Sequence, residues 1–266
     1  DVEIDGGTTN LILGASTIDG DLTLRSGGTI TDDGIATVRG TLTATTDQSD
    51  KIITLDELAV TGAFTLAPDG TGAVTIVNAA GLNLAASTMG GTFSGTATTG
   101  NISDSGTLAI TGTTTLVTSA DDATITLDDT SNAFTGALTI TTNDSSGTDS
   151  DATIDGGTTA LIIAASTIDG DLTVRSGNAS GITDSGNVTV AGNLVATTDA
   201  NSGVINMGTL RVDGTVALTT DGDGNATVVN DTLLDFANST VRGNLVATAT
   251  TGNISDSGTL AITGTT

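Results

Sequence analysis

The feature that most constrains the fold of this chain is its internal repetition. Residues 4–26 recur with few changes at residues 154–176, an offset of 150 residues. Residues 96–114 recur without change at residues 248–266, an offset of 152 residues. Repetition on this scale is typical of arrays in which each structural unit packs only on its neighbours.

The repeats divide the chain into two super-repeats of about 150 residues, 1–150 and 151–266, of which the second is incomplete. We therefore expect residues 1–266 to form a single continuous solenoid. Because the second super-repeat stops part-way, we also expect the chain to be an internal window of a longer array.

A shorter unit, marked by a glycine, lies inside each super-repeat. The glycine stands in a segment of the form apolar-x-Gly-x-apolar-x-apolar, and successive marker glycines are 20 to 34 residues apart. They are Gly20, Gly40, Gly62, Gly91, Gly112, Gly136, Gly170, Gly192, Gly214, Gly243 and Gly264. These glycines divide each super-repeat into six units of variable length.

The residues around the marker glycines alternate between apolar and polar. Two positions before the glycine all eleven residues are apolar, and two positions after it nine of eleven are. The positions between them carry mainly Thr, Asp, Arg and Asn. This alternation is typical of strands with one buried face, so we expect a strand on each side of the glycine.

A third strand is expected in the middle of many units, centred on isoleucines such as Ile30, Ile102 and Ile182. It is often followed by a turn such as Ser-Asp-Ser-Gly at residues 103–106. The sequence therefore predicts an all-β fold, a parallel β-helix (β-solenoid) with three strands per rung and about eleven rungs of 20–34 residues. An antiparallel sandwich is the alternative, but Asn-Gly hairpin signals are missing and the alternation recurs in register.

Composition excludes several classes of function. The chain has 31 Asp and Glu against 6 Lys and Arg, and it has no Cys, His, Trp or Tyr. Thiol chemistry, imidazole catalysis and Cys/His metal sites are therefore impossible. So few cations also argue against nucleic acid as a partner. The apolar runs are far shorter than the roughly 20 residues of a membrane-spanning helix, so no membrane insertion is expected.

Several segments resemble the repeats of filamentous-haemagglutinin-like bacterial surface proteins. They are GDLTLRSGGTITDDG, GNISDSGTLAITGTTTL, DDATITLDDTSNAFTGALTIT and GDLTVRSGNASGITDSG, and the resemblance covers nearly the whole chain. It implies a right-handed β-helix with three faces, secreted through an outer-membrane transporter of the two-partner type to the cell surface. The resemblance carries no catalytic residues with it.

Neighbouring carboxylates are the candidates for glycosidase chemistry, which needs two carboxyl groups at a fixed separation. The pairs are Asp32/Asp33, Asp121/Asp122 and Asp128/Asp129. Adjacent residues point to opposite faces of a strand or are both solvated in a turn, so we interpret these pairs as turn formers and solubilising charge. We expect no catalytic residues.

Residues 221–225 (Asp-Gly-Asp-Gly-Asn) resemble the first half of a calcium-binding loop. Thr232 stands where such a loop needs a bidentate Glu. We therefore expect a polar turn, with no specific metal or cofactor site and only diffuse binding of divalent cations to the acidic surface.

Two other sets of polar residues repeat along the chain. Arg25 and Arg175 are equivalent by repeat and are expected to form weak surface ion pairs, following Asp21 and Asp171. The third residues after the marker glycines are predicted to stack as one outward hydroxyl ladder. They are Thr23, Thr43, Thr65, Ser94, Thr115, Thr139 and Thr173. We interpret the ladder as β propensity and packing between rungs on a solvated face, with ice binding as the alternative.

The function expected from these observations is a non-catalytic structural segment of a giant extracellular bacterial fibre, a stalk, filament or surface matrix. Self-association into filaments or a surface layer is a possible use of such rods. The alternative is an adhesin that binds a cell-surface or polysaccharide receptor through its longer loops, expected in residues 63–91, 137–170 and 215–243. A polysaccharide-processing enzyme is the third and weakest hypothesis.

Overall fold

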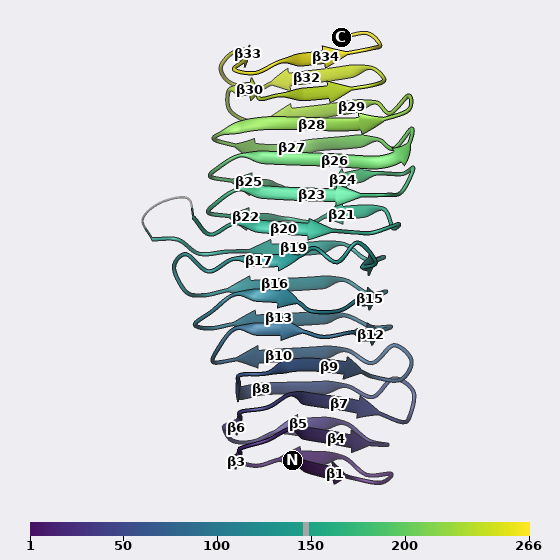
Figure 1. Cartoon of the computed structure of the whole chain (residues 1–266), viewed down its shortest axis with the longest axis vertical. Helices are drawn as coiled ribbons and strands as arrows, with labels where there is room; N and C mark the ends of the chain where they lie inside the picture. Colours follow the sequence, from purple (N-terminus) through teal and green to yellow (C-terminus); the bar gives the residue numbers. More distant parts are fainter. Residues whose placement is uncertain (146–148) are drawn as a thin grey trace.

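The computed structural model describes residues 1–145 and 149–266, and it confirms a parallel β-solenoid (Figure 1). The described residues contain no helix and make about twelve turns, close to the eleven rungs expected. Consequently no helix of the described chain is long and apolar enough to cross a membrane. The right-handedness implied by the resemblance stays a prediction.

Two long sheets form the broad faces of the rod, and we call them face A and face B. Face A contains β1 (Val2–Asp5), β4 (Leu22–Ser26), β7 (Leu42–Thr46), β9 (Ala63–Ala67), β11 (Leu82–Leu84), β14 (Ile102–Asp104), β17 (Ile125–Leu127), β20 (Ala152–Asp155), β23 (Leu172–Ser176), β26 (Leu194–Asn201), β28 (Thr215–Asp221), β30 (Leu234–Phe236) and β33 (Ile254–Asp256). Face B contains β2 (Leu11–Leu13), β5 (Ile30–Asp32), β8 (Ile53–Val60), β10 (Val74–Asn78), β13 (Phe93–Ala97), β16 (Thr114–Thr118), β19 (Leu138–Thr141), β21 (Leu161–Ile163), β24 (Ile182–Asp184), β27 (Ile205–Val212), β29 (Ala226–Asn230) and β32 (Leu245–Ala249).

The core forms because apolar residues stack on apolar residues from turn to turn. On face A, Leu22 pairs with Leu42, and Leu42 pairs with Phe64, all in parallel register. These three side chains are fully buried, as is the inward Ile76 of face B. The sequence alternation therefore correctly identified the buried face of the strands.

Short strands fill the narrow edges between the two faces. We call the edge where the chain passes from A to B edge 1, and the edge where it returns from B to A edge 2. The short strands are β3 (Ser16–Ile18), β6 (Ala36–Val38), β12 (Ser87–Met89), β15 (Leu108–Ile110), β18 (Ala133–Phe134), β22 (Ser166–Ile168), β25 (Val188–Val190), β31 (Ser239–Val241) and β34 (Leu260–Ile262). The last residues of β8 and β27 continue the stacks begun by β3 and β22.

The short strands change edge along the rod. β3 and β6 lie at edge 2, β12 and β15 at edge 1, and β22 and β25 again at edge 2, on the left, right and left of Figure 1. Chain order places β31 and β34 at edge 1 once more. Each stack of short strands therefore ends after a few turns and restarts on the opposite side.

The change of edge follows from the longer units. Between Gly62 and Gly91 the chain makes one and a half turns, through β9, β10 and β11, instead of one. The five-residue strand that follows the marker glycine then joins face B, whereas before it joined face A. A second long interval, from Gly136 to Gly170, restores the first arrangement.

This geometry corrects the count of turns in the super-repeat. Six units were expected to make six rungs, but β20, the equivalent of β1, is the seventh strand after β1 on face A. The two longer intervals each contribute an additional half turn. Some turns consequently have two strands rather than the three expected.

Candidate functional site

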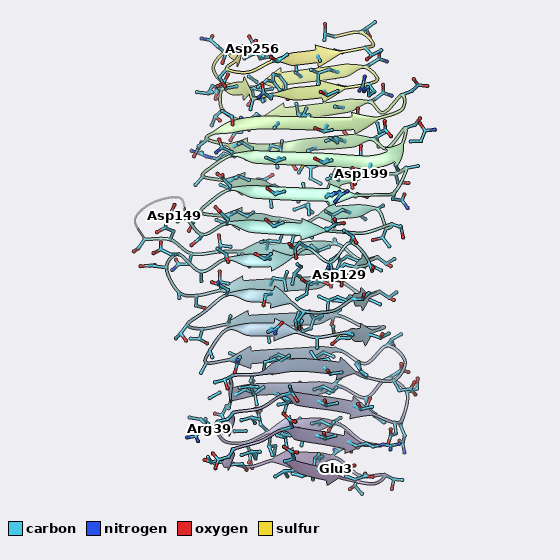
Figure 2. All side chains as sticks on the ribbon, in the orientation of Figure 1. Glu3, Arg39, Asp129, Asp149, Asp199 and Asp256 are labelled. Atoms are coloured by element: carbon cyan, nitrogen blue, oxygen red, sulfur yellow. The ribbon has the colours of Figure 1, made fainter. Side chains whose placement is uncertain are left out.

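The carboxylates lie mainly along the two edges of the rod. Apart from Glu3, Asp56, Glu57, Asp199 and Asp235, every acidic residue lies in a turn or at a strand terminus. Figure 2 shows Asp149 at one edge and Asp129 toward the other. The broad faces carry little charge, so the negative charge of the chain follows two lines.

A recurring aspartate at the end of the mid-unit strand binds the backbone of the next turn. The carboxylate of Asp32 accepts hydrogen bonds from the amides of Asp56 at 3.1 Å and Glu57 at 2.9 Å, 24 and 25 residues ahead. Equivalent contacts join Asp104 to the amides of Asp128 and Asp129, and Asp184 to those of Gly208 and Thr209. These side chains act between turns, whereas the sequence predicted only local turn formation.

Partial burial raises the pKa of Asp32, because desolvation of the carboxylate outweighs the two amide hydrogen bonds. The nearby Asp56 carboxylate raises it further. A raised carboxyl pKa in a cleft can mark a general acid. Here both oxygens of Asp32 receive backbone amides, which indicates a structural role for this carboxylate.

A second set of side chains accepts the amide of the residue that follows a marker glycine in the next turn. Asp151 accepts the amide of Asp171 at 2.7 Å, Asp171 accepts that of Asn193 at 2.6 Å, and Asn193 accepts that of Thr215 at 2.9 Å. Each side chain thereby fixes the corner of the turn above it. The same positions elsewhere on the rod use Asp1, Asp21, Asn225 and Asn244.

Two of the other candidate carboxylates, those of Asp121 and Asp129, also bind the chain. Asp121 accepts hydrogen bonds from Asn143 and Ser145, and Asp129 accepts the amide of Ser131. Asp122 has a positive φ of 59°, as expected for a turn residue. Asp33, the partner of Asp32 in sequence, is exposed.

The calcium-like segment 221–225 forms a tight turn. Gly222 has a φ of 59°, and the side chain of Asn225 accepts the amide of Asn244 at 2.7 Å. Across the described residues, no group of three or more acidic side chains could hold a metal ion. The segment therefore serves the stacking of turns in the same way as the other corners.

Arg25 and Arg175 pair with carboxylates one turn away rather than with Asp21 and Asp171. Arg25 binds Asp47 at 2.7 Å. Arg175, its equivalent, contacts Asp199 and, at 3.5 Å, Asp155. Asp155 is nearly buried, and desolvation raises its pKa despite the Gly157 amide and the neighbouring Arg175.

The predicted hydroxyl ladder is wrong as a single column. Thr23, Thr43 and Thr65 stack on face A, whereas Ser94 stacks on Thr75 of face B. The reason is the additional half turn between Gly62 and Gly91. The actual ladder on face B consists of Thr31, Thr54, Thr75, Ser94, Thr115 and Thr139.

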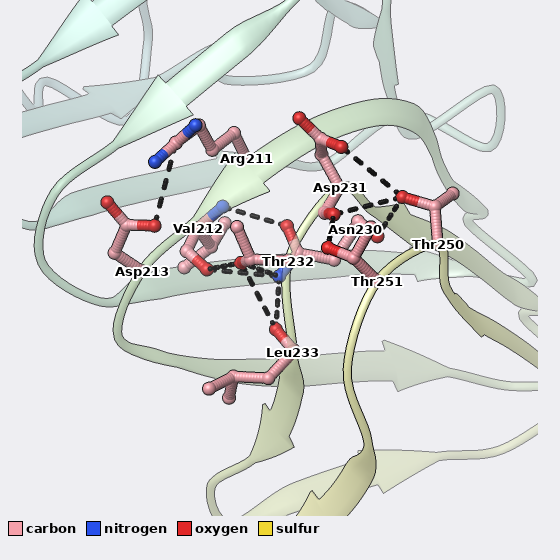
Figure 3. Close-up of polar contacts among 9 residues, drawn as sticks. All are labelled: Arg211, Val212, Asp213, Asn230, Asp231, Thr232, Leu233, Thr250 and Thr251. Atoms are coloured by element: carbon pink, nitrogen blue, oxygen red, sulfur yellow. Dashed lines mark hydrogen bonds and ion pairs between the residues drawn. The ribbon is translucent and has the colours of Figure 1, made fainter.

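Buried polar side chains complete the backbone where a stack of short strands ends. Asn230, fully buried, accepts the amide of Val212 at 2.8 Å and donates to the carbonyls of Val212 and Leu233 (Figure 3). Asn78 makes the equivalent contacts with Val60 in the first super-repeat. The sequence reasoning missed these residues, although an Asn in the inward register of an apolar strand was visible at both positions.

The new stack on the opposite edge begins with a serine of the same kind. The hydroxyls of Ser87, Ser166 and Ser239 accept the amides of Leu66, Ile140 and Leu218 at 3.0 to 3.1 Å. These amides belong to the long strand below each new stack. Asn and Ser together therefore satisfy the backbone at the first and third changes of edge, and Thr159 and Ser166 do so at the second.

The predicted binding loops are largely absent from the described residues. Residues 63–91 and 215–243 form strands of the solenoid, and residues 146–148 of the segment 137–170 lie outside the described residues. The surface near the third change of edge holds a shallow hollow of about 280 Å³, lined in part by Thr209, Arg211 and Asp231. Arg211 contacts Asp213 there at 3.6 Å (Figure 3).

Comparison with known proteins gives one match. No curated protein and no solved structure is similar enough to match the chain. The model of a family described as repeats of unknown function (DUF5649) matches residues 1–67, 71–141 and 223–266, which is more than half of the chain. The chain therefore belongs to the family of repeats of unknown function DUF5649.

Proposed function

We propose that this chain is a non-catalytic structural segment of an extended β-solenoid fibre on the outside of a bacterial cell. The observation that carries the proposal is the use made of its polar side chains. Asp32, Asp104, Asp171 and Asn230 all bind the backbone of a neighbouring turn. In an enzyme such polar side chains would contact a substrate, whereas here they hold one turn to the next.

The shape supports the same role. Sheets that continue from β1 to β33 give a rod of roughly 55–60 Å at about 4.8 Å per turn. A rod in which each turn stacks on the one before can be lengthened by adding turns, which suits a spacer or a filament. The resemblance to filamentous-haemagglutinin-like proteins adds secretion of the two-partner type to the proposal.

The experiment is electron microscopy of the cells that produce the protein, with gold-labelled antibodies against this chain. We expect gold along fibres or a layer outside the outer membrane, and loss of that structure when the gene is deleted. Gold confined to the cell interior would contradict the proposed location. Short isolated surface particles would contradict the fibre.

An adhesin remains the second candidate, and the hollow beside Arg211 is the observation that favours it. Its equivalent in the first super-repeat has Ala59 in place of Arg211, so a receptor bound there would meet only one copy per two super-repeats. Arg211→Ala tests this role, because it should weaken adhesion of the chain to target cells without changing its thermal unfolding.

A further inference from the structure

Face B carries less charge than face A, and the exposed Asp56 of β8 is among its few charged outward residues. Its central outward column runs through seven stacked residues, from Ile12 to Thr139, none of which is charged. A second column of five, from Ile162 to Val246, is also uncharged. Face A also has an uncharged central column, from Ser103 to Ala217, so the two faces differ in the outward residues beside that column.

The middle of face B is uncharged across its full width. In the four neighbouring strands β10, β13, β16 and β19, the outward residues are Thr, Ser or Val. They are Thr75, Val77, Ser94, Thr96, Thr115, Val117, Thr139 and Thr141. All are half-buried by their neighbours in the sheet, so the surface they form is flat and closely packed.

Face A is less uniform. Its outward positions carry Glu3, Asp5, Arg25, Asp155 and Arg175. Charges of both signs on a face hold water and must be paired or desolvated on contact. Burying face B against another flat surface therefore costs less desolvation free energy than burying face A.

We infer that face B is a lateral docking surface for face B of a second copy of this chain. The inference rests on the proposed structural role and specifies how rods would associate sideways. A second copy has the same 4.8 Å spacing between strands, so its rows of Thr and Val side chains match the rows on the first. Contacts between the edges of two copies are disfavoured, because these edges carry negative charge and repel each other.

The area of face B suits such a contact. Twelve strands spaced at about 4.8 Å, each about 16 Å long, give roughly 900 Å² per copy. Stable interfaces bury about 800 Å² per partner.

Two rods of charge −25 repel at long range, and about 1 M salt shortens that range to roughly 3 Å, so association should strengthen with salt.

The test is sedimentation velocity of the full 266-residue chain at low and high NaCl concentration. We expect a 25.8 kDa monomer at low salt and a species of twice that mass at high salt. The variant Thr115→Asp places a carboxylate in the middle of face B and should keep the chain monomeric at high salt.

Thr173→Asp is the matched control. Thr173 follows Gly170 as Thr115 follows Gly112, three residues after the glycine in each case, but it lies on face A. The control should associate like the unchanged chain. If Thr115→Asp does not fold, as judged by circular dichroism, Ser94→Asp tests the same face.

Two results would overturn the inference. The first is a chain that stays monomeric at every salt concentration. This result would overturn the inference even if Thr115 proved to be needed for binding an insoluble neutral polysaccharide. The second is an equal effect of the two Asp variants on association. Either result concerns lateral pairing alone, since unpaired rods on the cell surface would still agree with the proposed fibre.

Discussion

The side-chain amide of Asn78 pairs with both backbone groups of Val60, accepting from its nitrogen and donating to its oxygen, each at 2.8 Å. Val60 ends the stack of short strands at edge 2, so no strand above it supplies these partners. An amide side chain offers a donor and an acceptor side by side, as a peptide group does. Asn78 therefore ends the stack without leaving backbone groups unsatisfied.

We predict that Asn78→Ala lowers the free energy of unfolding by about 2–4 kcal/mol, because two buried backbone groups lose their partners. Urea unfolding measures the loss, and hydrogen exchange of the Val60 amide should become faster. Thr75→Ala, an outward change in the same strand, is the control and should cost clearly less. If both variants lost the same free energy of unfolding, the hydrogen bonds between Asn78 and Val60 would not be a source of stability.

We predict that Asp32 and Asp33 differ in their contribution to stability although they are adjacent. Asp32→Ala removes two hydrogen bonds to the next turn and should cost about 1–3 kcal/mol. Asp33→Ala changes an exposed side chain and should stay within about 0.5 kcal/mol. Thermal unfolding of both variants decides, and a larger loss for Asp33 would refute the role given to Asp32.

We predict that the marker glycines are required because successive turns approach too closely for a side chain. A Cβ atom on Gly62 would lie 2.3 Å from the carbonyl oxygen of Gly40. Gly62→Ala should therefore reduce the yield of folded protein or its melting temperature. Gly208→Ala is the control, since nothing lies within 4 Å of the added atom, and it should leave the melting temperature unchanged or raise it slightly.

We predict that protonation of Asp32 and Asp155 stabilises the protein as the pH falls from 7 toward 3.8. Burial raises the pKa of Asp32 and Asp155 above the 3.8 of an unfolded Asp, so the ionised form of each is penalised in the folded state. The penalty is fully present at neutral pH and is lost as these groups take up protons. Protonation of other carboxylates also reduces the large negative charge and its self-repulsion, which has the same direction.

Asp155→Asn tests this pH dependence. The variant should be more stable than the unchanged chain at pH 7, and its stability should vary less between pH 7 and 4. Asp33→Asn, at an exposed position, should leave the difference between the two pH values unchanged. A chain whose melting temperature falls steadily from pH 7 to 4 would contradict the prediction.

The sequence was sufficient for the fold because each unit repeats its apolar register. Leu22, Leu42 and Phe64 could be identified as inward residues, and they stack on one another in the structure. The marker glycines were also correctly predicted to lie between strands. Local alternation determines which side of a strand is buried, and this information is contained within a single unit.

The face to which each strand belongs could not be predicted in the same way. Thr65 and Ser94 hold the same place after a marker glycine, yet they lie on opposite faces. The difference depends on how many half turns fit between Gly62 and Gly91, a property of the path of the chain through space. The contacts of Asp32 with residues 24 and 25 positions ahead depend on that same path.

The most direct test of this account is the distance between spin labels on pairs of introduced cysteines, in a chain that has none of its own. Ser94 is labelled together with Thr75 or with Thr65, and the distances are measured by electron paramagnetic resonance. The account predicts a short distance for Thr75 and Ser94, which are neighbours on face B. It predicts a distance well beyond about 10 Å, the spacing of packed sheets, for Thr65 and Ser94. A shorter distance between Thr65 and Ser94 than between Thr75 and Ser94 would contradict the alternation of the unit between the two faces.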